Sequence, residues 1–312
     1  MKKYLLFLTI LLSLTSCSEV ARKIGGVFSK EASEEALDEG AKKTLKQTGK
    51  EVGEESAKDM SVLMVKEGKD ALELLAKEHP ELHAIIEKVS QSRFTKAFSL
   101  DDYVVKKLEN GSIVLEHKGA PNWRIVMNGN TIKAKGGAVQ GAKNTGLNEF
   151  LNYPLPNKTY VIDDYMTYKT DEFGRIAESI SIFDGDKTIA RKRITVNSEG
   201  SNGVPRRKIS EIGGKDGEDD FGHLVQMDEG GPNELINQVP MGSKTNRSGI
   251  WREIENYERK MTQQEGQKIV SIRKPLYKGN SRRPYAFEVL ITVDGKPAEI
   301  AGKQCPFLVE NV

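Results

Sequence analysis

The amino-acid sequence predicts an α+β fold, in which helices and strands occupy largely separate parts of the chain. Between residues 57 and 89, apolar side chains recur at spacings of three, four and seven, as in amphipathic helices, and Pro80 interrupts the pattern. From about Phe94 the pattern changes to short alternating runs separated by Asn-Gly dipeptides, which indicate β-hairpins. Much of the expected helix therefore precedes the expected sheet.

Length and composition limit the classes to which the protein can belong. Its 312 residues suggest two domains, since a domain usually has about 100–200 residues. With 37% hydrophobic and 29% charged residues, it is neither a membrane-embedded helical bundle nor a highly charged disordered chain. The 47 Lys and Arg residues nearly balance the 45 Asp and Glu residues, so the net charge of +2 does not indicate a polyanionic partner. Two cysteines exclude a disulfide-rich scaffold.

The first residues have the organisation of a secretory signal peptide. Met1-Lys2-Lys3 is basic and precedes a mainly apolar run from Tyr4 to Leu14, which is too short for a membrane-spanning helix of about 20 residues. The run ends in Leu14-Thr15-Ser16-Cys17, which resembles the bacterial lipobox; an ordinary signal peptide with a chance cysteine is the alternative. The resemblance implies cleavage after residue 16 and a lipid anchor on Cys17.

A lipid anchor would place the protein in the bacterial cell envelope. Ser18 after Cys17 gives no retention signal for the inner membrane, so we expect the outer membrane, on its periplasmic or surface face. With Cys17 modified, Cys305 has no partner for an intramolecular disulfide. The surrounding sequence, Cys305-Pro306-Phe307-Leu308, predicts a buried structural cysteine.

Changes of composition divide the chain into four parts. Residues 1–16 are the lipoprotein signal peptide, and residues 17–92, rich in Glu, Lys and Ala, form a helical stalk or spacer. A partner-binding coiled coil is the alternative for this stalk, but the apolar repeat does not hold over several heptads. Residues 93–149 form a small β-hairpin region and a Gly-rich linker, and residues 150–312 form the C-terminal domain.

The expected strands and turns follow from local patterns. Hairpin turns are expected at Asn110-Gly111 and Asn128-Gly129, and a helix from about Ser248 to Thr262. Strands are expected at residues 112–116, 123–127, 158–162, 166–169, 176–183, 188–196, 269–272 and 286–293.

Three polar motifs follow one another in the C-terminal half. His223, the only histidine after residue 117, lies in the run DDFGHL at residues 219–224. Residues 230–241 read GGPNELINQVPM, and residues 245–256 read TNRSGIWREIEN. A lone histidine is usually structural, but its position ahead of two further polar motifs indicates a catalytic site.

These ordered motifs resemble those of the DNA/RNA non-specific endonucleases, a branch of the ββα-metal (His-Me finger) nucleases, in their bacterial secreted and toxin form. The resemblance covers about residues 155–295 and does not include the N-terminal half. It implies a ββα-metal nuclease core with an antiparallel sheet in the C-terminal half. It also implies a hydrolase that cleaves the phosphodiester bonds of DNA and RNA without sequence specificity.

The resemblance assigns roles to individual residues. His223 matches the general base, and a neutral imidazole can accept a proton from water at pH 7. Gly222 would keep side-chain bulk away from the scissile phosphate. Asn246 matches the ligand of one Mg²⁺ ion, for which Mn²⁺ is a substitute; Mg²⁺ prefers oxygen ligands and keeps several waters. Glu255 matches the glutamate that holds metal-bound waters. The ion would stabilise the charge that develops on the phosphate.

One departure from the family pattern concerns a missing cation. Many relatives carry arginine where this chain has Phe221, and that arginine could stabilise the transition state. We take Arg207 as the candidate replacement. Arg191, Arg206 and Arg247 are alternatives, and the sequence does not choose among them.

A second departure concerns the spacing of the last motif. Asn246 and Glu255 are nine residues apart, one more than the family interval. At about 100° per residue, an unbroken helix would point them in opposite directions. Either Ser248-Gly249 absorbs the extra residue ahead of the helix or a π-bulge does so. Glu253 is the alternative carboxylate, but Trp251 to Glu255 keeps the family interval.

Other residues have structural interpretations. We expect Trp251 in the core rather than stacked on a base, Asn237 bonded to the backbone, and Asp219 and Asp220 fixing their loop. A basic set either contacts phosphates or forms a solvated hairpin loop. This set comprises Arg273, Lys274, Lys278, Arg282 and Arg283.

The expected partners are DNA and RNA as substrates, the membrane through the lipid anchor, and, as a further candidate, a cognate immunity protein. One alternative is a catalytically inactive envelope lipoprotein that binds nucleic acid or a partner. Another is a structural envelope lipoprotein in which the helical N-terminal region is the active part.

Overall fold

A computed structural model of the protein describes residues 61–92, 99–137, 146–184, 207–264 and 266–312. All of these residues belong to one compact unit, Met60–Val312. The expected signal peptide, Cys17, most of the stalk and the expected strand at 188–196 lie outside the described residues.

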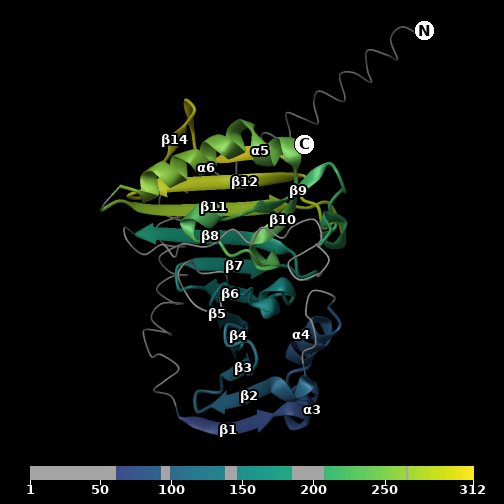
Figure 1. The fold of residues 1–312 in the computed structure, drawn as a ribbon. Coiled ribbons are helices and arrows are strands. Elements are labelled where there is room, and N and C mark those ends of the chain that lie inside the picture. The colour runs from purple at the N-terminus through teal and green to yellow at the C-terminus, as the bar shows by residue number, and fades with distance from the viewer. Residues whose placement is uncertain (1–60, 93–98, 138–145, 185–206, 265) are drawn as a thin grey trace, which may run out of the picture. The chain divides into compact units, whose positions relative to one another are not determined.

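A mostly antiparallel sheet of twelve strands dominates the described part of the chain (Figure 1). Its order is β1-β2-β3-β4-β5-β6-β7-β8-β11-β12-β13, and β16 also pairs with β12. The N-terminal strands are β1 (Val62–Glu67), β2 (Tyr103–Leu108), β3 (Ile113–His117), β4 (Arg124–Asn128) and β5 (Thr131–Ala134). The C-terminal strands are β6 (Thr159–Ile162), β7 (Met166–Thr170), β8 (Ile176–Asp184), β11 (Lys268–Leu276), β12 (Ala286–Val293), β13 (Lys296–Pro297) and β16 (Phe307–Glu310).

The Asn-Gly turns lie where the sequence predicts them. Gly111 lies in the turn between β2 and β3, and Gly129 in the turn between β4 and β5; both have positive φ angles, of 81° and 54°. A residue with a Cβ adopts that conformation only at a cost, so glycine favours these turns. Alternate residues of β11 are buried, as expected for a strand with one face against the core.

The sheet continues across the boundary expected near residue 150. β5 and β6 pair in parallel, with Thr131 opposite Thr159 and Ala134 opposite Ile162. The hairpins of residues 93–149 and the strands of residues 150–312 therefore share one hydrogen-bonded sheet. The division of the chain into a stalk, a hairpin region and a C-terminal domain stays a prediction.

Two helices follow β1 within the described part of the expected stalk: α3 (Gly68–Glu78) and α4 (Pro80–Ser90). Pro80 starts α4, a position at which no intrahelical N–H is needed. Leu75, Leu82 and Ile86 are among the side chains that these helices bury. Strand β1 lies where the pattern from residue 57 predicts a helix, so the helical prediction is wrong for these residues, and the strand leaves Leu63 and Val65 exposed. None of the helices in the described part of the chain is long and apolar enough to cross a bilayer.

A ββα unit lies outside the large sheet. A hairpin of β9 (Asp219–His223) and β10 (Gln238–Gly242) leads into α5 (Ser243–Arg247) and α6 (Gly249–Thr262). Trp251 of α6 packs against Phe287 of β12, with ring centroids 5.0 Å apart, and is 1% exposed. Its predicted place in the core is confirmed, and so is the α+β class.

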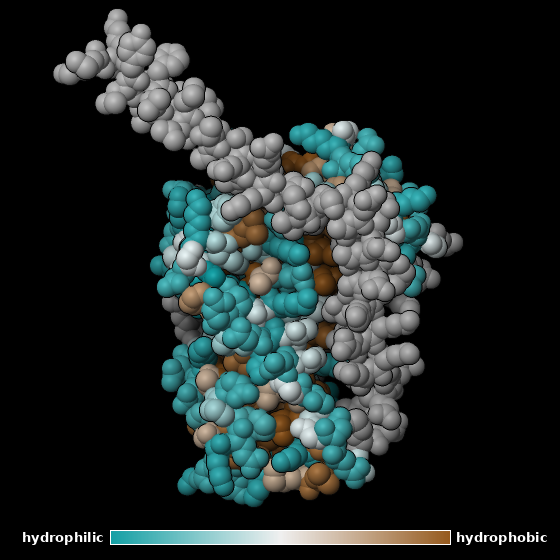
Figure 2. Space-filling model, turned by 180° about the vertical axis from the view of Figure 1, so that it is seen from behind, coloured by the Kyte–Doolittle hydropathy of each residue, from teal (hydrophilic) through white to brown (hydrophobic). Residues whose placement is uncertain are grey.

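The other small elements lie in the connections. The short helices are η1 (Leu100–Asp102), η2 (Glu149–Asn152), η5 (Ile209–Ile212), η6 (Met227–Glu229) and η7 (Leu235–Asn237), and the strands β14 (Glu299–Ile300) and β15 (Lys303–Gln304) form a separate pair. Cys305 follows β15 and is buried, as predicted, and burial raises the pKa of its thiol to about 11. On the side shown in Figure 2, the coloured surface is mainly hydrophilic, with smaller hydrophobic areas between.

Candidate active site

His223 ends β9, opposite Gln238 of β10. Its Nε2 atom lies 3.2 Å from Oδ1 of Asn233 and 3.1 Å from Nε2 of Gln238. The preceding Gly222 is buried, and a Cβ on it would lie 2.5 Å from Cβ of Met241 on the neighbouring strand. This close approach to Met241 is a packing reason for glycine here, besides the expected clearance for a phosphate.

Asn237 fixes the connection between the two strands of the hairpin. Its Oδ1 accepts hydrogen bonds from the amide of Val225 (2.8 Å) and the hydroxyl of Tyr168 (3.0 Å). Its Nδ2 donates to the carbonyls of Val225 (2.8 Å) and Pro232 (2.9 Å). Asn237 is fully buried, so its polar atoms need these partners, and its predicted role in holding the backbone is confirmed. Gly231 passes so close to the Val225 carbonyl that a Cβ would lie 1.9 Å from the oxygen.

Asn246 lies in α5 and is bound to the strand that carries His223. Its Nδ2 donates to Oδ2 of Asp220 (3.0 Å), and Arg247 donates to both carboxylate oxygens of Asp220 (2.8 and 2.6 Å). Burial would raise the pKa of Asp220, but the hydrogen bonds from Arg247 and Asn246 lower it below its ordinary value. A charged Asp220 thus fixes the amide nitrogen of Asn246, while its Oδ1 makes no hydrogen bond within the described residues.

The helix that carries the last motif is broken between Asn246 and Glu255. α5 ends at Arg247, Ser248 has extended angles (φ −149°, ψ −179°), and Gly249 starts α6 with a φ of 68°. Ser248-Gly249 therefore absorbs the extra residue, and the alternative of a π-bulge is wrong. Because the helix is interrupted, the half-turn separation expected for nine helical steps does not apply to Asn246 and Glu255.

Glu255 is the better placed of the two candidate carboxylates. Its side chain is 12% exposed and accepts a hydrogen bond from Arg252 (2.9 Å), whereas Glu253 is exposed. Burial raises the pKa of Glu255, and the Arg252 guanidinium opposes that shift. The Glu255 carbonyl accepts a hydrogen bond from Nε2 of Gln226 (2.7 Å). α6 is thereby joined to the chain just after His223.

Hydrogen bonds thus connect α5 to β9 and α6 to the chain just after β9. Asn246 contacts Asp220, near the start of β9, and the Glu255 backbone contacts Gln226, beyond its end; His223 lies between these points in the sequence. Asp220 and His223 are three residues apart, which is roughly 10 Å along a strand, and their side chains point to opposite faces of β9. No hydrogen bond joins Asn246 to His223 or to Glu255. Their convergence on one phosphate stays a prediction.

The candidate arginines have different surroundings. The Arg207 guanidinium lies 5.9 Å from the ring centroid of Tyr153 and interacts electrostatically with Glu149. Arg247 is bound to Asp220. Arg191 and Arg206 lie outside the described residues. The replacement of the family arginine by Arg207 stays a prediction.

Within the basic set, two residues have structural partners. Arg273 is 1% exposed and forms an ion pair with the buried Glu258, so for this residue both alternatives, a phosphate contact and a solvated hairpin loop, are wrong. Arg283 donates to both oxygens of Asp219 (2.8 Å each), and Asp219 also accepts a hydrogen bond from the amide of Lys215. The predicted loop-fixing role of Asp219 is confirmed.

A divalent cation would find few protein ligands here. The described residues contain no group of three or more His, Cys, Asp or Glu side chains that could hold a metal ion. The donors near β9 are instead the Oδ1 atom of Asn246 and the carboxylate of Asp220, both oxygens. Oxygen donors on a partly exposed helix fit an ion that keeps most of its water, as Mg²⁺ does.

The side chains that contact the His223 ring are not predicted from the sequence. Asn233 and Gln238 contact Nε2, and Glu234, next to Asn233, is a fully buried carboxylate. The sequence shows Asn233 only as part of a Gly-Gly-Pro-Asn turn, and Glu234 looks like any exposed loop glutamate. No local pattern reveals these contacts, because they depend on partners far along the chain.

Comparison with known proteins supports the interpretation of the motifs. Residues 156–295 match the family described as DNA/RNA non-specific endonuclease. Among solved structures, NucA from Streptococcus agalactiae with bound magnesium is similar with a TM-score of 0.36 and 12% identity, over 64% of this chain and 81% of that chain. The Sda1 nuclease with bound zinc is similar with a TM-score of 0.32 and 17% identity, over 47% of this chain and 76% of that chain. At such TM-scores the assignment depends on the family match.

Residues 156–295 therefore match a DNA/RNA non-specific endonuclease domain, and the protein is a hydrolytic nuclease. The resemblance expected for residues 155–295 is confirmed.

Proposed function

We propose that the protein is a lipid-anchored, metal-dependent endonuclease that hydrolyses DNA and RNA without sequence specificity, with His223 as the general base. The observation that carries this proposal is that both parts of the last motif bond to the chain around His223, one to β9 and the other just beyond its end. Asn246 bonds to Asp220, and the Glu255 backbone bonds to Gln226, on either side of His223. The family match over residues 156–295 supports the reaction class.

The chemistry requires a base and a compensating charge. A phosphodiester repels nucleophiles, so the attacking water has to lose a proton while negative charge develops on the phosphate. His223, partly exposed at the end of β9, would take that proton. A divalent cation, when bound, would stabilise the developing charge and the leaving oxygen.

The chain's own residues would prepare the site for that cation. Asp220 holds the Asn246 amide by its nitrogen, so the Oδ1 atom is the donor that Asn246 presents. Glu255, held by Arg252 on the less exposed side of α6, would accept hydrogen bonds from water at the ion. Mg²⁺ is our proposed ion, with Mn²⁺ as a substitute. Arg207 remains our candidate for the cation that stabilises the transition state.

Lack of sequence specificity and export are parts of the same proposal. The phosphate and sugar chemistry common to all nucleotides is sufficient for cleavage without base contacts.

The basic, apolar and Cys17-terminated leader supports export and anchoring in the cell envelope, with the outer membrane preferred. A role as a toxin with a cognate immunity protein fits the same leader. Membrane fractionation of the full-length chain and of Cys17→Ser tests the anchor: the variant should leave the membrane fraction.

The nuclease proposal is tested with residues 18–312, a plasmid and a single-stranded RNA. Wild-type protein should cleave both polymers with Mg²⁺ and neither with EDTA. His223→Ala should lower the rate by about 10²–10⁴-fold, the usual contribution of a general base. Asn246→Ala should need more Mg²⁺ for half-maximal rate, because a metal ligand is lost.

His83→Ala is the matched control, since His83 lies on α4 and is paired with Glu87 there. It should cleave at the wild-type rate. Binding of both polymers at micromolar protein without cleavage would instead support the inactive, nucleic-acid-binding lipoprotein.

A further inference from the structure

We propose that the turn between β7 and β8 and the loop between β11 and β12 together bind unpaired bases of the substrate. Phe173 and Tyr285 would stack on the bases. Lys278 and Arg282 would contact the neighbouring phosphates, and we call these four residues the stacking surface. It would give the nuclease a preference for single strands over duplexes of the same length. This inference depends on the proposed function, since the strand bound there is the one to be cleaved.

Exposure distinguishes two aromatic side chains from all the others in the described residues. Phe173 is 41% exposed and Tyr285 is 45% exposed, whereas each remaining aromatic side chain of those residues is buried or half-buried. Phe173 lies in the turn between β7 and β8, and Tyr285 lies at the end of the loop between β11 and β12. An exposed ring keeps apolar area in contact with water, so two of them in adjacent segments indicate a binding surface.

The turn and the loop are adjacent because β8 and β11 are antiparallel neighbours (Figure 1). This pairing places the start of β8 beside the end of β11. There the hydroxyl of Tyr277 donates to the carbonyl of Ile176 (3.1 Å), across 101 residues of sequence. The two exposed rings therefore lie at the same end of neighbouring strands.

Phe173 is supported by an arginine that is itself fixed. The Arg175 guanidinium lies 4.6 Å from the ring centroid of Phe173 and 4.4 Å from that of Tyr277. Its Nη1 donates to the carbonyls of Gly279 (2.6 Å) and Ser281 (2.8 Å), which belong to the loop. A ring that is already held in place loses little conformational entropy when a base stacks on it. Arg175 also joins the turn to the loop, so the stacking surface is one unit.

Lys278 and Arg282 provide positive charge beside the rings. Both residues are exposed, and neither forms an ion pair with another described residue. Nζ of Lys278 lies 5.0 Å from the ring centroid of Tyr285. Residues 171–175 and 277–285 contain four Lys or Arg residues against two Asp or Glu residues, so the surface is positive. Rings that stack on bases next to cations that contact phosphates are the usual means of binding single strands.

The loop is attached to the strand that carries the candidate active site. Arg283 donates to both carboxylate oxygens of Asp219 (2.8 Å each), the first residue of β9. The next residue, Asp220, binds Asn246, our proposed metal ligand. His223 is four residues beyond Asp219, roughly 13 Å along the strand. About four stacked nucleotides, at about 3.4 Å each, span that length.

Stacking on exposed rings favours single strands for a physical reason. In a duplex the faces of the bases are covered by their neighbours, and a side chain can stack on them only after the bases are unstacked. A single strand presents these faces directly. Every base has such a face, so stacking needs no particular sequence, in agreement with a nuclease without sequence specificity.

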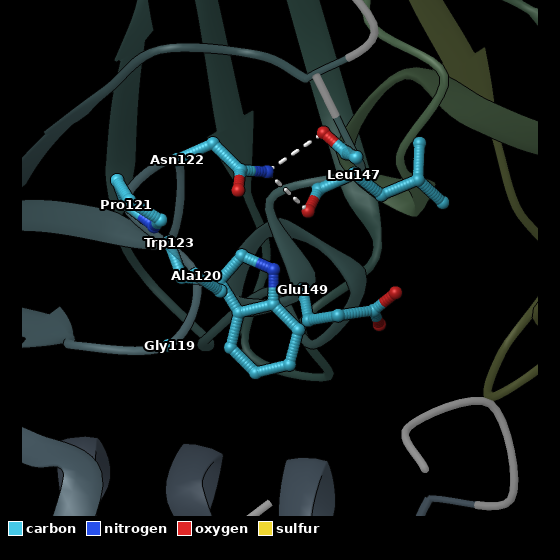
Figure 3. A pocket seen from close by; sticks show the side chains of 8 residues that line it. Gly119, Ala120, Pro121, Asn122, Trp123, Leu147 and Glu149 are labelled. Atoms are coloured by element: carbon cyan, nitrogen blue, oxygen red, sulfur yellow. Dashed lines mark hydrogen bonds between the residues drawn. The ribbon is translucent and has the colours of Figure 1, made fainter. Parts of the chain in front are cut away.

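The pocket beside the connection between β3 and β4 lacks these features (Figure 3). Its lining includes the indole of Trp123, which is only 5% exposed, and the carboxyl group of Glu149, but no Lys or Arg. It offers little ring area for stacking and no cation for a phosphate. We therefore place the single strand at the loop between β11 and β12.

Fluorescence anisotropy of residues 18–312 in EDTA measures binding without cleavage. The probes are a labelled DNA strand of about 12 nucleotides, within the usual range of site sizes, the same sequence as RNA, and the DNA duplex. Wild-type protein should bind both single strands more tightly than the duplex. Phe173→Ala and Tyr285→Ala should each weaken single-strand binding about fivefold or more, the usual effect of removing a stacking ring. Both rings are exposed, so both variants should fold.

Conservative and charge variants test the two parts of the surface separately. Tyr285→Phe keeps the ring and should bind the single strand within about twofold of the wild type. Lys278→Gln and Arg282→Gln should each reduce the slope of log affinity against log salt concentration by about 0.7, the value for one phosphate contact on a single strand. The controls are Leu63→Ala, an exposed apolar residue of β1, and Lys69→Gln on α3, and neither should change single-strand binding.

Cleavage with Mg²⁺ gives a second readout. The double variant Phe173→Ala/Tyr285→Ala should raise KM for the single strand with little change in kcat, because its rings bind the substrate away from the reacting phosphate. KM for a duplex plasmid should rise less. An equal rise for both substrates would contradict a surface that selects unpaired bases.

Equal affinity of the wild type for the single strand and the duplex would overturn the proposal, as would wild-type single-strand binding by both alanine variants. Sedimentation with phosphatidylglycerol vesicles tests a different partner. If the alanine variants lose vesicle binding but keep single-strand binding, the surface belongs to the membrane and the proposal is wrong. If the wild type binds single strands through these rings but cleaves nothing, the proposed function fails and the stacking surface stands.

Discussion

Two groups of ionisable side chains contact the two parts of the interrupted helix, one group at α6 and the other at α5, and they differ in burial. Beneath α6, Arg273 pairs with Glu258, and Glu229 lies close enough to interact with both; all of them are at most 1% exposed. At the outer side of β9, Arg247 pairs with Asp220, and the Arg247 side chain is 71% exposed. The first group connects α6 to β11, and the second connects α5 to β9.

This difference in burial distinguishes charged residues that stabilise the fold from charged residues at the candidate site. A buried charge that loses its partner stays out of water, so breaking the ion pair beneath α6 should destabilise the folded state. Arg247 is solvated with or without its partner, and Asp220, whose side chain is 20% exposed, keeps the hydrogen bond from Asn246, so this pair should contribute less to stability. We therefore expect Arg247 to leave Asp220 more easily than Arg273 leaves Glu258, as binding of an ion or a phosphate at β9 would require.

Replacement of Arg273 by methionine should have the largest effect on stability. Arg273→Met leaves Glu258 buried without its cation and removes the hydrogen bond to Ser271 (2.8 Å). Loss of one partner of a buried pair typically costs about 3–5 kcal/mol. Urea denaturation followed by circular dichroism measures the change in the free energy of unfolding.

Lys274→Met is the matched control on the same strand. Lys274 pairs with Glu178 at 3.5 Å, and its side chain is 43% exposed. The control should lose less than about 1 kcal/mol. Equal losses in the two variants would contradict the proposed role of burial.

Replacement of Glu229 by glutamine should stabilise the protein in a pH-dependent way. Burial, and next the charge of Glu258, raise the pKa of Glu229 to about 9. The folded state therefore keeps a proton that the unfolded chain releases above its ordinary pKa, and wild-type stability should fall as the pH rises towards 9. Glu229→Gln removes this loss and keeps the acceptor for Gln226 (2.6 Å).

The gain from Glu229→Gln should be absent near pH 4 and grow as the pH rises to 8, by at most about 1.4 kcal/mol for each pH unit above the ordinary pKa of the carboxyl. Thermal unfolding at several pH values measures it. Glu253→Gln, on the exposed side of α6, is the control. A gain that does not depend on pH would show that packing, not ionisation, distinguishes Glu229.

The sequence predicts most of the longer strands of the large sheet, the hairpin turns and the motif order, because each depends on local patterns, whereas β1, β9 and β10 are not among the expected strands. Alternation of apolar and polar residues identifies β11 and β12, and the dipeptides Asn110-Gly111 and Asn128-Gly129 identify two hairpin turns. Ser248-Gly249, one of the two expected ways to absorb the extra residue, is where the helix breaks. The family motifs supply the site residues themselves, and the match over residues 156–295 bears out that resemblance.

The remaining features depend on contacts between distant residues, which local patterns do not encode. The parallel pairing of β5 with β6 joins two regions that composition separates. Arg273 belongs to a basic stretch in the sequence but is buried, because α6 supplies Glu258 above it. Glu234 is an ordinary loop residue until Gly137 and Asn148 are brought to it.

Replacement of Arg247 by glutamine should have the smallest effect on stability, because the Arg247 side chain is already exposed to water in the folded protein. The thermal midpoint should equal that of the wild type, and the hydrogen bond from Asn246 to Asp220 should persist. Differential scanning calorimetry beside Arg273→Met measures the contrast directly. A midpoint lowered as far as in Arg273→Met would mean that the pair at β9 is part of the structural core, and that Asp220 is not free to rearrange around a bound ion.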